Sequence, residues 1–559
     1  MRTLLLLSIA VASSPAQQAD LLLYNGKIIT GWASKPVVSS VAIRAGKFVA
    51  VGEEVPAVQR IDLKGRTVLP GLIDSHTHPI SSALSEKDNP IPVMNSIADV
   101  QAYIREQTKR LPPDKLIIAL KVYSTRLKER RYPTRWELDK AAPDRPAMTD
   151  NSYASVLNSA LLKKLNITRD TPQPANGKII KDKNGEPTGL ILGATHILGP
   201  LRASAKATPA DMKWALKAMQ EHYNAVGITS TIDRGQTSEG FRVYQDMHRR
   251  GELTVRSYVT QLITAQGTVK DVRQEIERLP FVTGFGDDML RVGSLKVVLD
   301  GGILIGTALL REPYGENTGI YGYKDPDYIG VQAVPRENLF EMARVANELG
   351  WQMTAHTAGG GATDLLIDAY EIANRDKPIK DRRFTVTHGN FPDARAIERS
   401  RQLGIVYDCQ PAWHHYDGQA IAPAFGPRRM KDFIPLRSLF DAGIVVAGGS
   451  DHMIRFDSRN AINPYNPFFG MWMAVTRKTS DGGVLGPEQA ISRAEALKMW
   501  TWNGAYLSFE ETLKGSIEPG KLADLVVVTK DILECPVDEI KDTEALVTMV
   551  GGKTVYGKF

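Results

Sequence analysis

Short runs of alternating apolar and polar residues, separated by turn dipeptides, occupy both ends of the chain. The N-terminal runs are "LLLYNGKIIT", "SVAIRAGKFVAVG" and "RIDLKGRTVLP", and similar runs near the C-terminus are "GSIEPGKLADLVVVTKD" and "ALVTMVGGKTVYGKF". Their Asn-Gly, Ala-Gly and Lys-Gly dipeptides are typical of hairpin turns. This pattern predicts that residues 18–68 and 506–559 pair into one small β-sandwich domain.

A different pattern fills residues 69–505, where short apolar runs alternate with longer helical stretches. Predicted strands include "LIIALKVY", "AVGITSTID", "LKVVLDGG" and "FTVTHGN", and predicted helices include "TPADMKWALKAMQEHYNAV" and "RENLFEMARVANELG". Strands that alternate with helices favour a parallel sheet, and over such a length they favour a closed barrel. The expected fold class is therefore α/β, a (β/α)8 TIM-type barrel joined to the β-sandwich, with its chemistry where the barrel strands end.

Composition narrows the class of protein without naming a function. The 559 residues are 43% hydrophobic and 24% charged, which is close to the average of soluble globular proteins. The 69 basic and 63 acidic residues leave a net charge of +6, and the basic residues do not form long blocks. No nucleic-acid partner is therefore expected. Two cysteines, Cys409 and Cys535, can form at most one disulfide and cannot form a thiolate metal cluster.

The first residues, "MRTLLLLSIAVASSPAQQAD", place one arginine before an apolar run and then small residues. This order predicts a signal peptide over residues 1–17, because the run is too short to span a bilayer comfortably. An uncleaved anchor or an apolar N-terminal strand is the alternative. We expect an exported protein, periplasmic or extracellular, with no stable membrane insertion.

The stretch "GLIDSHTHP" carries two histidines, His76 and His78, at the end of a predicted strand. Side chains two residues apart on a strand project to the same face, so both imidazoles can bind one cation such as Zn²⁺. Taken alone, the pair is equally compatible with polar residues that close an ordinary strand.

Further ionisable residues follow other predicted strands in the same manner. His356 in "MTAHTAGGG", His388 in "TVTHGN" and Asp451 in "VVAGGSD" each lie at a strand end before small residues. Lys296 lies inside the apolar run "SLKVVLD", where a charged ammonium is costly to bury. These residues, with His76 and His78, predict a binuclear metal site.

A desolvated lysine has a lowered pKa, and its neutral amine can add carbon dioxide to form a carbamate. Carbamylation of Lys296 would turn a misplaced cation into a bridging carboxylate. Two alternatives stay open: His356 and His388 as hydrogen-bonded core residues, and Lys296 as an unmodified lysine that reaches a carboxylate such as Asp300.

Together these motifs resemble the amidohydrolase superfamily. The resemblance is carried by "PGLIDSHTHP", Lys296 in "KVVLDGG", His356, His388, "GSDH" and the C-terminal "TWNGAYLSFEETLKGSIEPGKLADLVVV". Within the superfamily the chain resembles the branch of N-substituted formamide deformylase-like metal-dependent hydrolases (amidohydrolase family 3), over nearly all of the mature chain.

The resemblance implies an exported hydrolase that cleaves an amide or other non-peptide C–N bond of a small molecule with a metal-activated hydroxide. It implies two divalent metal ions, zinc by ligand type, with His76 and His78 on the more buried ion and His356 and His388 on the more exposed one. Carbamylated Lys296 would bridge the ions, and Asp451 would bind the first ion and act as general base. A homo-oligomer is compatible with the sequence.

Substrate contacts are expected from four further residues. Many relatives of this branch carry a histidine where this chain has Tyr153, and "PAWHHYDG" offers His414 or His415 after a predicted strand. Arg311 and His452 are the other candidates.

Two competing hypotheses are a mononuclear deaminase of a heterocyclic amine, which needs Lys296 unmodified, and a non-catalytic periplasmic protein that binds a metal or ligand.

Overall fold

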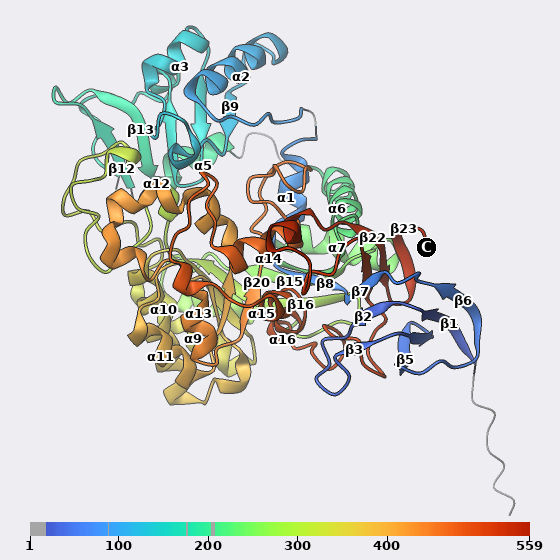
Figure 1. Ribbon diagram of the computed structural model, residues 1–559. Coiled ribbons are helices and arrows are strands. Elements are labelled where there is room, and N and C mark those ends of the chain that lie inside the picture. The colour runs from blue at the N-terminus through green and yellow to red at the C-terminus, as the bar shows by residue number, and fades with distance from the viewer. Residues whose placement is uncertain (1–17, 88, 175–176, 203–206) are drawn as a thin grey trace, which may run out of the picture.

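An eight-stranded parallel sheet curls into a barrel at the centre of the molecule (Figure 1). The structure is a computed structural model that describes residues 18–87, 89–174, 177–202 and 207–559, so the predicted signal peptide lies outside the described residues. The barrel confirms the predicted fold class. Its strands are β8 (Leu72–Thr77), β14 (Ile228–Gln236), β15 (Arg256–Leu262), β16 (Leu290–Val298), β17 (Met353–Thr357), β18 (Thr385–His388), β19 (Val406–Cys409) and β20 (Val446–Gly448).

The last residues of β8 are joined to the segment just beyond the carboxyl end of β20. The Asp451 N–H donates a hydrogen bond of 2.8 Å to the His76 carbonyl, and Thr77 forms an isolated parallel bridge with His452. Two segments that are far apart in the sequence, each with predicted ligands, are therefore fixed against each other by backbone contacts.

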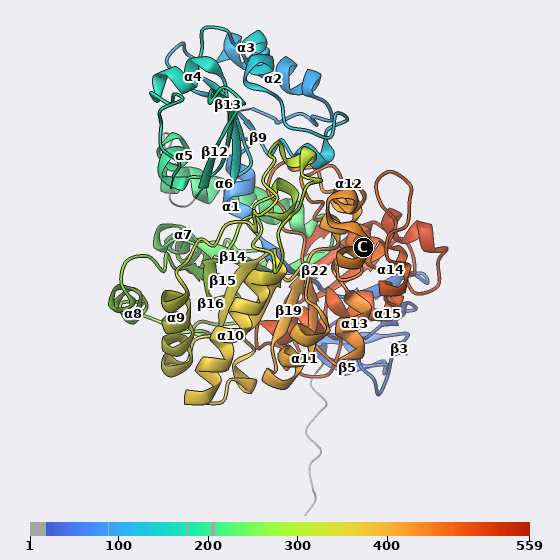
Figure 2. The ribbon, with the colours of Figure 1, turned by 90° about the vertical axis from the view of Figure 1, so that its left-hand side faces the viewer.

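Helices cover the outside of the barrel, and Figure 2 shows α9, α10 and α11 along one side of it. The sequence at the start of α6 shows why a helix begins there. The Thr208 side chain accepts a hydrogen bond from the Asp211 N–H in a reciprocal capping box, and Pro209 occupies the first turn. Helices of the barrel layer are α6 (Pro209–Asn224), α7 (Ser238–Arg249), α8 (Val269–Glu277), α9 (Arg336–Leu349), α10 (Gly360–Asp376), α11 (Ala394–Leu403), α13 (Leu436–Asp441), α15 (Arg493–Met499) and α16 (Trp502–Leu507).

A five-stranded sheet is inserted between β8 and β14, and it lies above the barrel in Figures 1 and 2. The segment "LIIALKVY" supplies β9 of this inserted sheet and not a barrel strand, because a short apolar strand has the same pattern in either sheet. Its elements are α2 (Ile97–Arg110), β9 (Ile117–Leu120), α3 (Arg135–Ala141), β10 (Ala147–Asp150), β11 (Ala154–Leu157), α4 (Ser159–Lys164), β12 (Gly177–Lys181) and β13 (Pro187–Gly193).

Two helices connect the barrel and the inserted sheet along the chain, and two more follow β19 and β20. The connecting pair is α1 (Pro79–Leu84) and α5 (Thr195–Arg202), and the other pair is α12 (Pro411–Met430) and α14 (Pro467–Thr476). Among the described residues, no helix is both long and apolar enough to cross a membrane.

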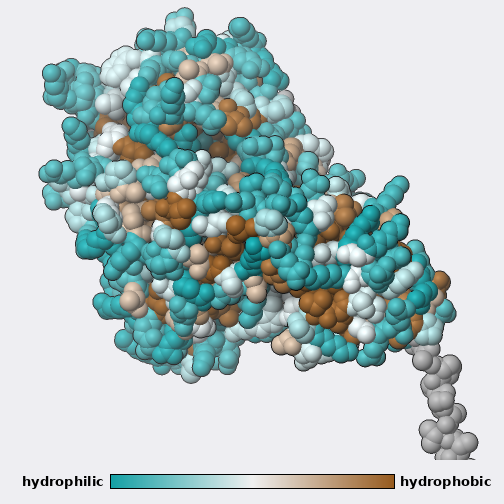
Figure 3. All heavy atoms as spheres, viewed as in Figure 1, coloured by the Kyte–Doolittle hydropathy of each residue, from teal (hydrophilic) through white to brown (hydrophobic). Residues whose placement is uncertain are grey.

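On the face drawn in Figure 3, hydrophilic residues dominate and apolar residues lie in small separate groups.

Both chain ends contribute to a pair of sheets beside the barrel. Leu23, Ile43 and Phe48 from one sheet share a core with Val527 and Met549 from the other. One sheet contains β1 (Ala19–Tyr24), β4 (Val41–Arg44), β5 (Lys47–Val51) and β6 (Ala57–Asp62), and the other contains β2 (Lys27–Ile29), β3 (Val37–Val38), β7 (Thr67–Pro70), β21 (Leu525–Val528), β22 (Ala545–Val550) and β23 (Lys553–Gly557).

Candidate metal centre

Three predicted ligands meet at the end of β8. The His76 Nε2 and His78 Nε2 atoms are 3.3 Å apart, and Asp451 Oδ1 lies 3.4 Å from the first and 3.5 Å from the second. A tetrahedral zinc ion with bonds of about 2.0–2.2 Å places its ligand atoms about 3.4 Å from one another. The spacing and chemistry of the three atoms therefore fit one divalent cation.

The other predicted ligands lie beside this group. The His388 ring stacks on the His76 ring at 5.0 Å between centroids, and the His356 ring meets the His388 ring edge-on at 4.5 Å. Lys296 lies on β16, which pairs with β17, the strand of His356. It lines a cavity of about 450 Å³ together with these histidines. All six predicted metal-site residues face this cavity: His76, His78, Lys296, His356, His388 and Asp451.

Three of the histidines are oriented through the ring nitrogen that faces away from the cavity. In each case the Nδ1 atom donates to a buried side-chain oxygen, which leaves Nε2 with its lone pair toward the cavity. The pairs are His76 with Asp408 Oδ2 at 3.0 Å, His356 with Asp300 Oδ1 at 2.9 Å and His388 with Gln410 Oε1 at 2.7 Å.

Asp300 has a role other than pairing with Lys296. Besides the His356 ring, its carboxylate accepts the N–H groups of Ala358 at 2.9 Å and Gly359 at 2.8 Å. The alternative that Lys296 pairs with Asp300 is wrong, because no ion pair or hydrogen bond of the Lys296 ammonium occurs within the described part of the chain.

Backbone conformation also sets two of the candidate ligands. His388 has φ of 71° and Asp451 has φ of 53°, both in the left-handed region that side chains other than glycine rarely adopt. Such a conformation costs roughly 1–3 kcal/mol and persists only where the surroundings enforce it. Here it directs both side chains into the cavity at the strand ends.

Burial governs the ionisation of the cavity residues. It lowers the pKa values of His76 and His388 well below the ordinary range, so both imidazoles are neutral and able to bind a cation. Burial, assisted by the Arg234 charge, also lowers the pKa of Lys296 to about 8. Burial alone would raise the pKa of Asp451, but the hydrogen bond from His78 and the positive charge of Lys296 outweigh it and keep that pKa below its ordinary value.

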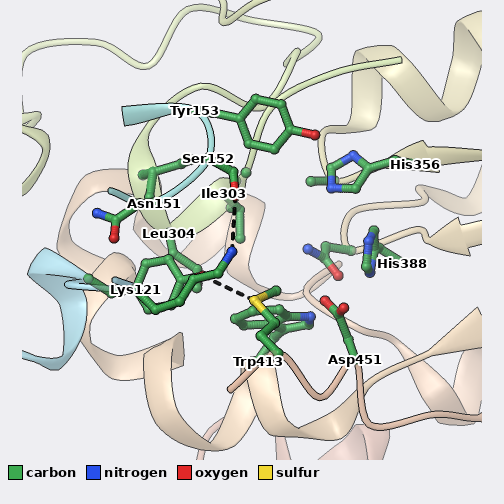
Figure 4. Close-up of a pocket in the computed structure, with 16 residues that line it drawn as sticks. Lys121, Asn151, Ser152, Tyr153, Ile303, Leu304, His356, His388, Trp413 and Asp451 are labelled. Atoms are coloured by element: carbon green, nitrogen blue, oxygen red, sulfur yellow. Dashed lines mark hydrogen bonds between the residues drawn. The ribbon is translucent and has the colours of Figure 1, made fainter. Parts of the chain in front are cut away.

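The cleft beyond the cavity is lined by apolar and aromatic side chains with a polar edge (Figure 4). Leu304 and Trp413 form part of the apolar wall, and Tyr153 places its ring 5.9 Å from the His356 ring. At the edge supplied by the inserted sheet, the Lys121 ammonium donates to Ser152 Oγ at 3.0 Å. Of the four predicted substrate contacts, Tyr153 lies in this cleft.

The other three predicted substrate contacts have different partners outside the cleft. Arg311 forms a bidentate ion pair with Asp364 at 2.7 and 2.8 Å. His414 Nε2 donates to the Leu485 carbonyl at 2.8 Å, and His452 Nε2 donates to the Arg455 carbonyl at 2.7 Å. These side chains support the loops around the barrel and do not face the site.

The sequence did not indicate Trp413 of the cleft, nor Asp408 and Gln410, which orient candidate ligands. Trp413 lies in "PAWHHYDG", a run in which the sequence predicted a histidine as the substrate contact. Because α12 begins at Pro411, the Trp413 side chain lies in the cleft and the His414 side chain points away from it. Asp408 and Gln410 lie in "VYDCQ" at the end of β19, and their position after a buried strand was the signal that could have indicated them.

Comparison with known proteins gives a consistent result. The model of a protein family described as "Amidohydrolase family" matches residues 59–556. The chain is 28% identical over 561 residues to the N-substituted formamide deformylase of Arthrobacter pascens, which covers 97% of this chain and 99% of that protein. It is also 28% identical over 515 residues to the putative amidohydrolase YtcJ of Bacillus subtilis, which covers 90% of this chain and 91% of that protein.

Solved structures support the fold. An uncharacterized metal-dependent hydrolase from Pyrococcus horikoshii superposes with a TM-score of 0.69 at 23% identity, over 93% of this chain and 99% of that chain. The family match extends from the sandwich through the barrel to the last strands, and it includes every residue of the candidate metal centre. The chain therefore belongs to the amidohydrolase family and is a metal-dependent hydrolase of carbon–nitrogen bonds other than peptide bonds.

Proposed function

We propose that this protein is an exported enzyme that hydrolyses an amide or a related C–N bond of a small molecule at a binuclear metal centre. The observation that carries the proposal is the triangle of His76 Nε2, His78 Nε2 and Asp451 Oδ1, with sides of 3.3 to 3.5 Å, in a cavity shared with His356, His388 and Lys296. Export is supported by the apolar N-terminal run "LLLLSIAVA".

The residues divide into two binding sets. His76, His78 and Asp451 would hold one ion, His356 and His388 would hold the second, and carbamylated Lys296 would lie between them. When bound, divalent ions supply Lewis-acid chemistry, because they lower the pKa of water and polarise a carbonyl group. Imidazole and carboxylate ligands suit zinc, and they also accept iron, manganese, nickel or cobalt.

Asp451 is the proposed general base. Its lowered pKa keeps the carboxylate ionised at neutral pH, so it can take a proton from the attacking water. The water oxygen bonds to the carbonyl carbon, the C–N bond breaks, and Asp451 returns the proton to the departing nitrogen. The products are a carboxylic acid and an amine, and no protein nucleophile takes part.

The cleft indicates which substrates to test first. Tyr123, Leu304, Trp413 and Met453 offer an apolar surface next to the ligands, which suits an apolar group on the substrate. The Arthrobacter pascens relative is named for N-substituted formamides. We therefore rank N-formyl and other N-acyl amines with apolar substituents ahead of ureas and lactams.

The test is amine release from such substrates by the metal-loaded protein, with and without a chelator. The proposal predicts hydrolysis that is lost on chelation and restored by added metal, and Asp451→Asn should reduce kcat by about 10²–10⁴-fold. Release of ammonia from heterocyclic amines in place of amide hydrolysis would favour the deaminase. Undiminished turnover by Asp451→Asn would rule out Asp451 as the base.

A further inference from the structure

Arg234, near the end of β14, has an incomplete set of hydrogen bonds. Its side chain is fully buried, its Nε donates to the Ser75 carbonyl at 2.9 Å, and the same Nε lies 3.1 Å from Asp408 Oδ2. Neither terminal nitrogen, Nη1 or Nη2, has a hydrogen-bond partner within the described residues. A guanidinium stays charged in proteins and offers five N–H donors, so most of its donors lack an acceptor.

Arg234 shares its part of the metal cavity with a second cation, because Lys296 lines the same cavity. The nearest carboxylate, Asp408, is already engaged: it accepts from Ser75 Oγ at 2.8 Å, His76 Nδ1 at 3.0 Å and Gln410 Nε2 at 2.9 Å. A buried charge without full compensation is strongly destabilising. Within the described residues, the two terminal nitrogens of Arg234 therefore have no anionic acceptor on this side of the cavity.

We infer that Arg234 is a positioning residue for a carbamate on Lys296, with its two terminal nitrogens donating to the carbamate oxygens. The planar fork of a guanidinium matches a carboxylate-like group, and such charge-assisted pairs are strong. The inference rests on the proposed function, because it assumes that Lys296 carries the bridging group.

The reaction balances with carbon dioxide as the only co-reactant. The lone pair of the neutral Lys296 amine forms the N–C bond, one C=O electron pair moves to oxygen, and one N–H proton leaves to solvent. The side chain thereby becomes an anion. Arg234 then faces an opposite charge where it previously faced a like one, and both of its terminal nitrogens gain acceptors.

Buried water is the other means of satisfying these nitrogens. The hydroxyls of Ser230, Thr260 and Ser294 in the neighbouring strands also lack partners within the described residues. If water alone occupied this region, Arg234 would have no influence on modification of Lys296. The two explanations therefore differ in what happens to the carbamate when Arg234 is replaced.

The experiment measures carbamate directly by ¹³C NMR after incubation with zinc and ¹³C-bicarbonate, together with zinc binding. We expect a labelled carbamate in the wild-type protein, none in Lys296→Ala, and a large loss in Arg234→Gln, with zinc at the second site bound about 10–100-fold more weakly. Arg477→Gln is the matched control, because Arg477 is also buried but donates to the carbonyls of Phe433 and Ile434. Its label should be unchanged.

Equal label and equal zinc binding in Arg234→Gln and wild type would overturn the inference. If Arg234→Gln does not fold, Arg234→Ala supplied with free guanidinium at millimolar concentration should regain the label, whereas methylammonium should not restore it. No difference between these two cations would also overturn the inference. A wild-type protein without label would remove the carbamate and the role of Arg234 together, while amide hydrolysis by that protein would leave the hydrolase function standing.

Discussion

At the scale of single residues, the site depends on groups that orient the ligands as much as on the ligands. Asp408 accepts from the His76 ring and lies beside Arg234, so its charge fixes both side chains. Partners of this kind hold the imidazole in the tautomer that presents Nε2 to a cation.

Asp408→Asn should therefore weaken metal binding without touching a ligand. The amide cannot supply the same charge to the His76 ring, so we expect affinity to fall about 10–100-fold, measured by competition with a chelator. Asp246→Asn, on the outer surface of α7, is the control and should bind metal as the wild type does. Equal affinity in Asp408→Asn and wild type would contradict the orienting role.

Lys296 gives a pH-dependent prediction for the metal-free protein without bicarbonate. Burial lowers its pKa from 10.5 to about 8, so between these values the unfolded chain binds more protons and stability rises with pH. Below pH 8 the full cost of the buried charge is present, about 3 kcal/mol. Lys296→Met should therefore raise the Tm most below pH 8, and the gain should shrink toward pH 10.5.

The exposed Lys217 on α6 provides the control, because Lys217→Met removes a charge that is already in water. Thermal unfolding in chelator, at intervals from neutral to alkaline pH, separates the two variants. A Lys296→Met protein that is no more stable than wild type at neutral pH would show that Lys296 is not a costly buried cation.

At the scale of elements, the first turn of α12 separates two neighbouring residues with different roles. Trp413 lines the cleft, whereas His414 is turned to the Leu485 carbonyl. Trp413→Leu should raise KM about tenfold for substrates with an apolar group, or ~1.4 kcal/mol, with little change in kcat. Steady-state kinetics with two substrates that differ only in that group would measure this.

The matched variant is His414→Leu, which keeps a large side chain at position 414 but removes the hydrogen-bond donor of the Leu485 carbonyl. It should lower stability by about 1 kcal/mol and leave KM unchanged. If His414→Leu raised KM as strongly as Trp413→Leu, the orientation of α12 described above would be contradicted, and the original expectation for His414 would return.

The candidate ligands could be predicted from sequence because each lies at or near the end of a buried strand, and parallel strands bring their carboxyl ends to one edge of a barrel. The sequence could not show that Trp413 and not His414 lines the cleft, because this depends on the residue at which α12 begins. The inserted sheet was also missed, because the pattern of β9 does not distinguish a barrel strand from a strand in another sheet.

At the scale of the whole molecule, a buried ion pair fastens the barrel to the sheets built from the chain ends. Arg256 of β15 donates to both carboxylate oxygens of Asp524, at 2.7 and 2.9 Å, and the Gly551 N–H donates to the same carboxylate at 2.8 Å. Both side chains of the pair are about 4% exposed. The pair lies at the start of β15, whereas the candidate metal ligands lie at or near the carboxyl ends of the barrel strands.

Asp524→Ala should therefore lower stability without altering the chemistry. Removing one partner of a buried pair costs about 3–5 kcal/mol, so the Tm should fall clearly, while kcat/KM per folded chain and metal content stay at the wild-type level. Asp246→Ala, which breaks a surface pair with Arg250, should cost under about 1 kcal/mol. A loss of metal in Asp524→Ala would show instead that the sandwich shapes the site.

The central claim, a binuclear centre formed by His76, His78, His356, His388, Asp451 and Lys296, is tested most directly by metal content per chain. Elemental analysis of the protein purified with bicarbonate and without chelators should find about two equivalents of divalent metal, and Lys296→Ala should lose at least one of them. One equivalent in the wild type, unchanged in Lys296→Ala, would contradict the binuclear centre and favour a mononuclear enzyme.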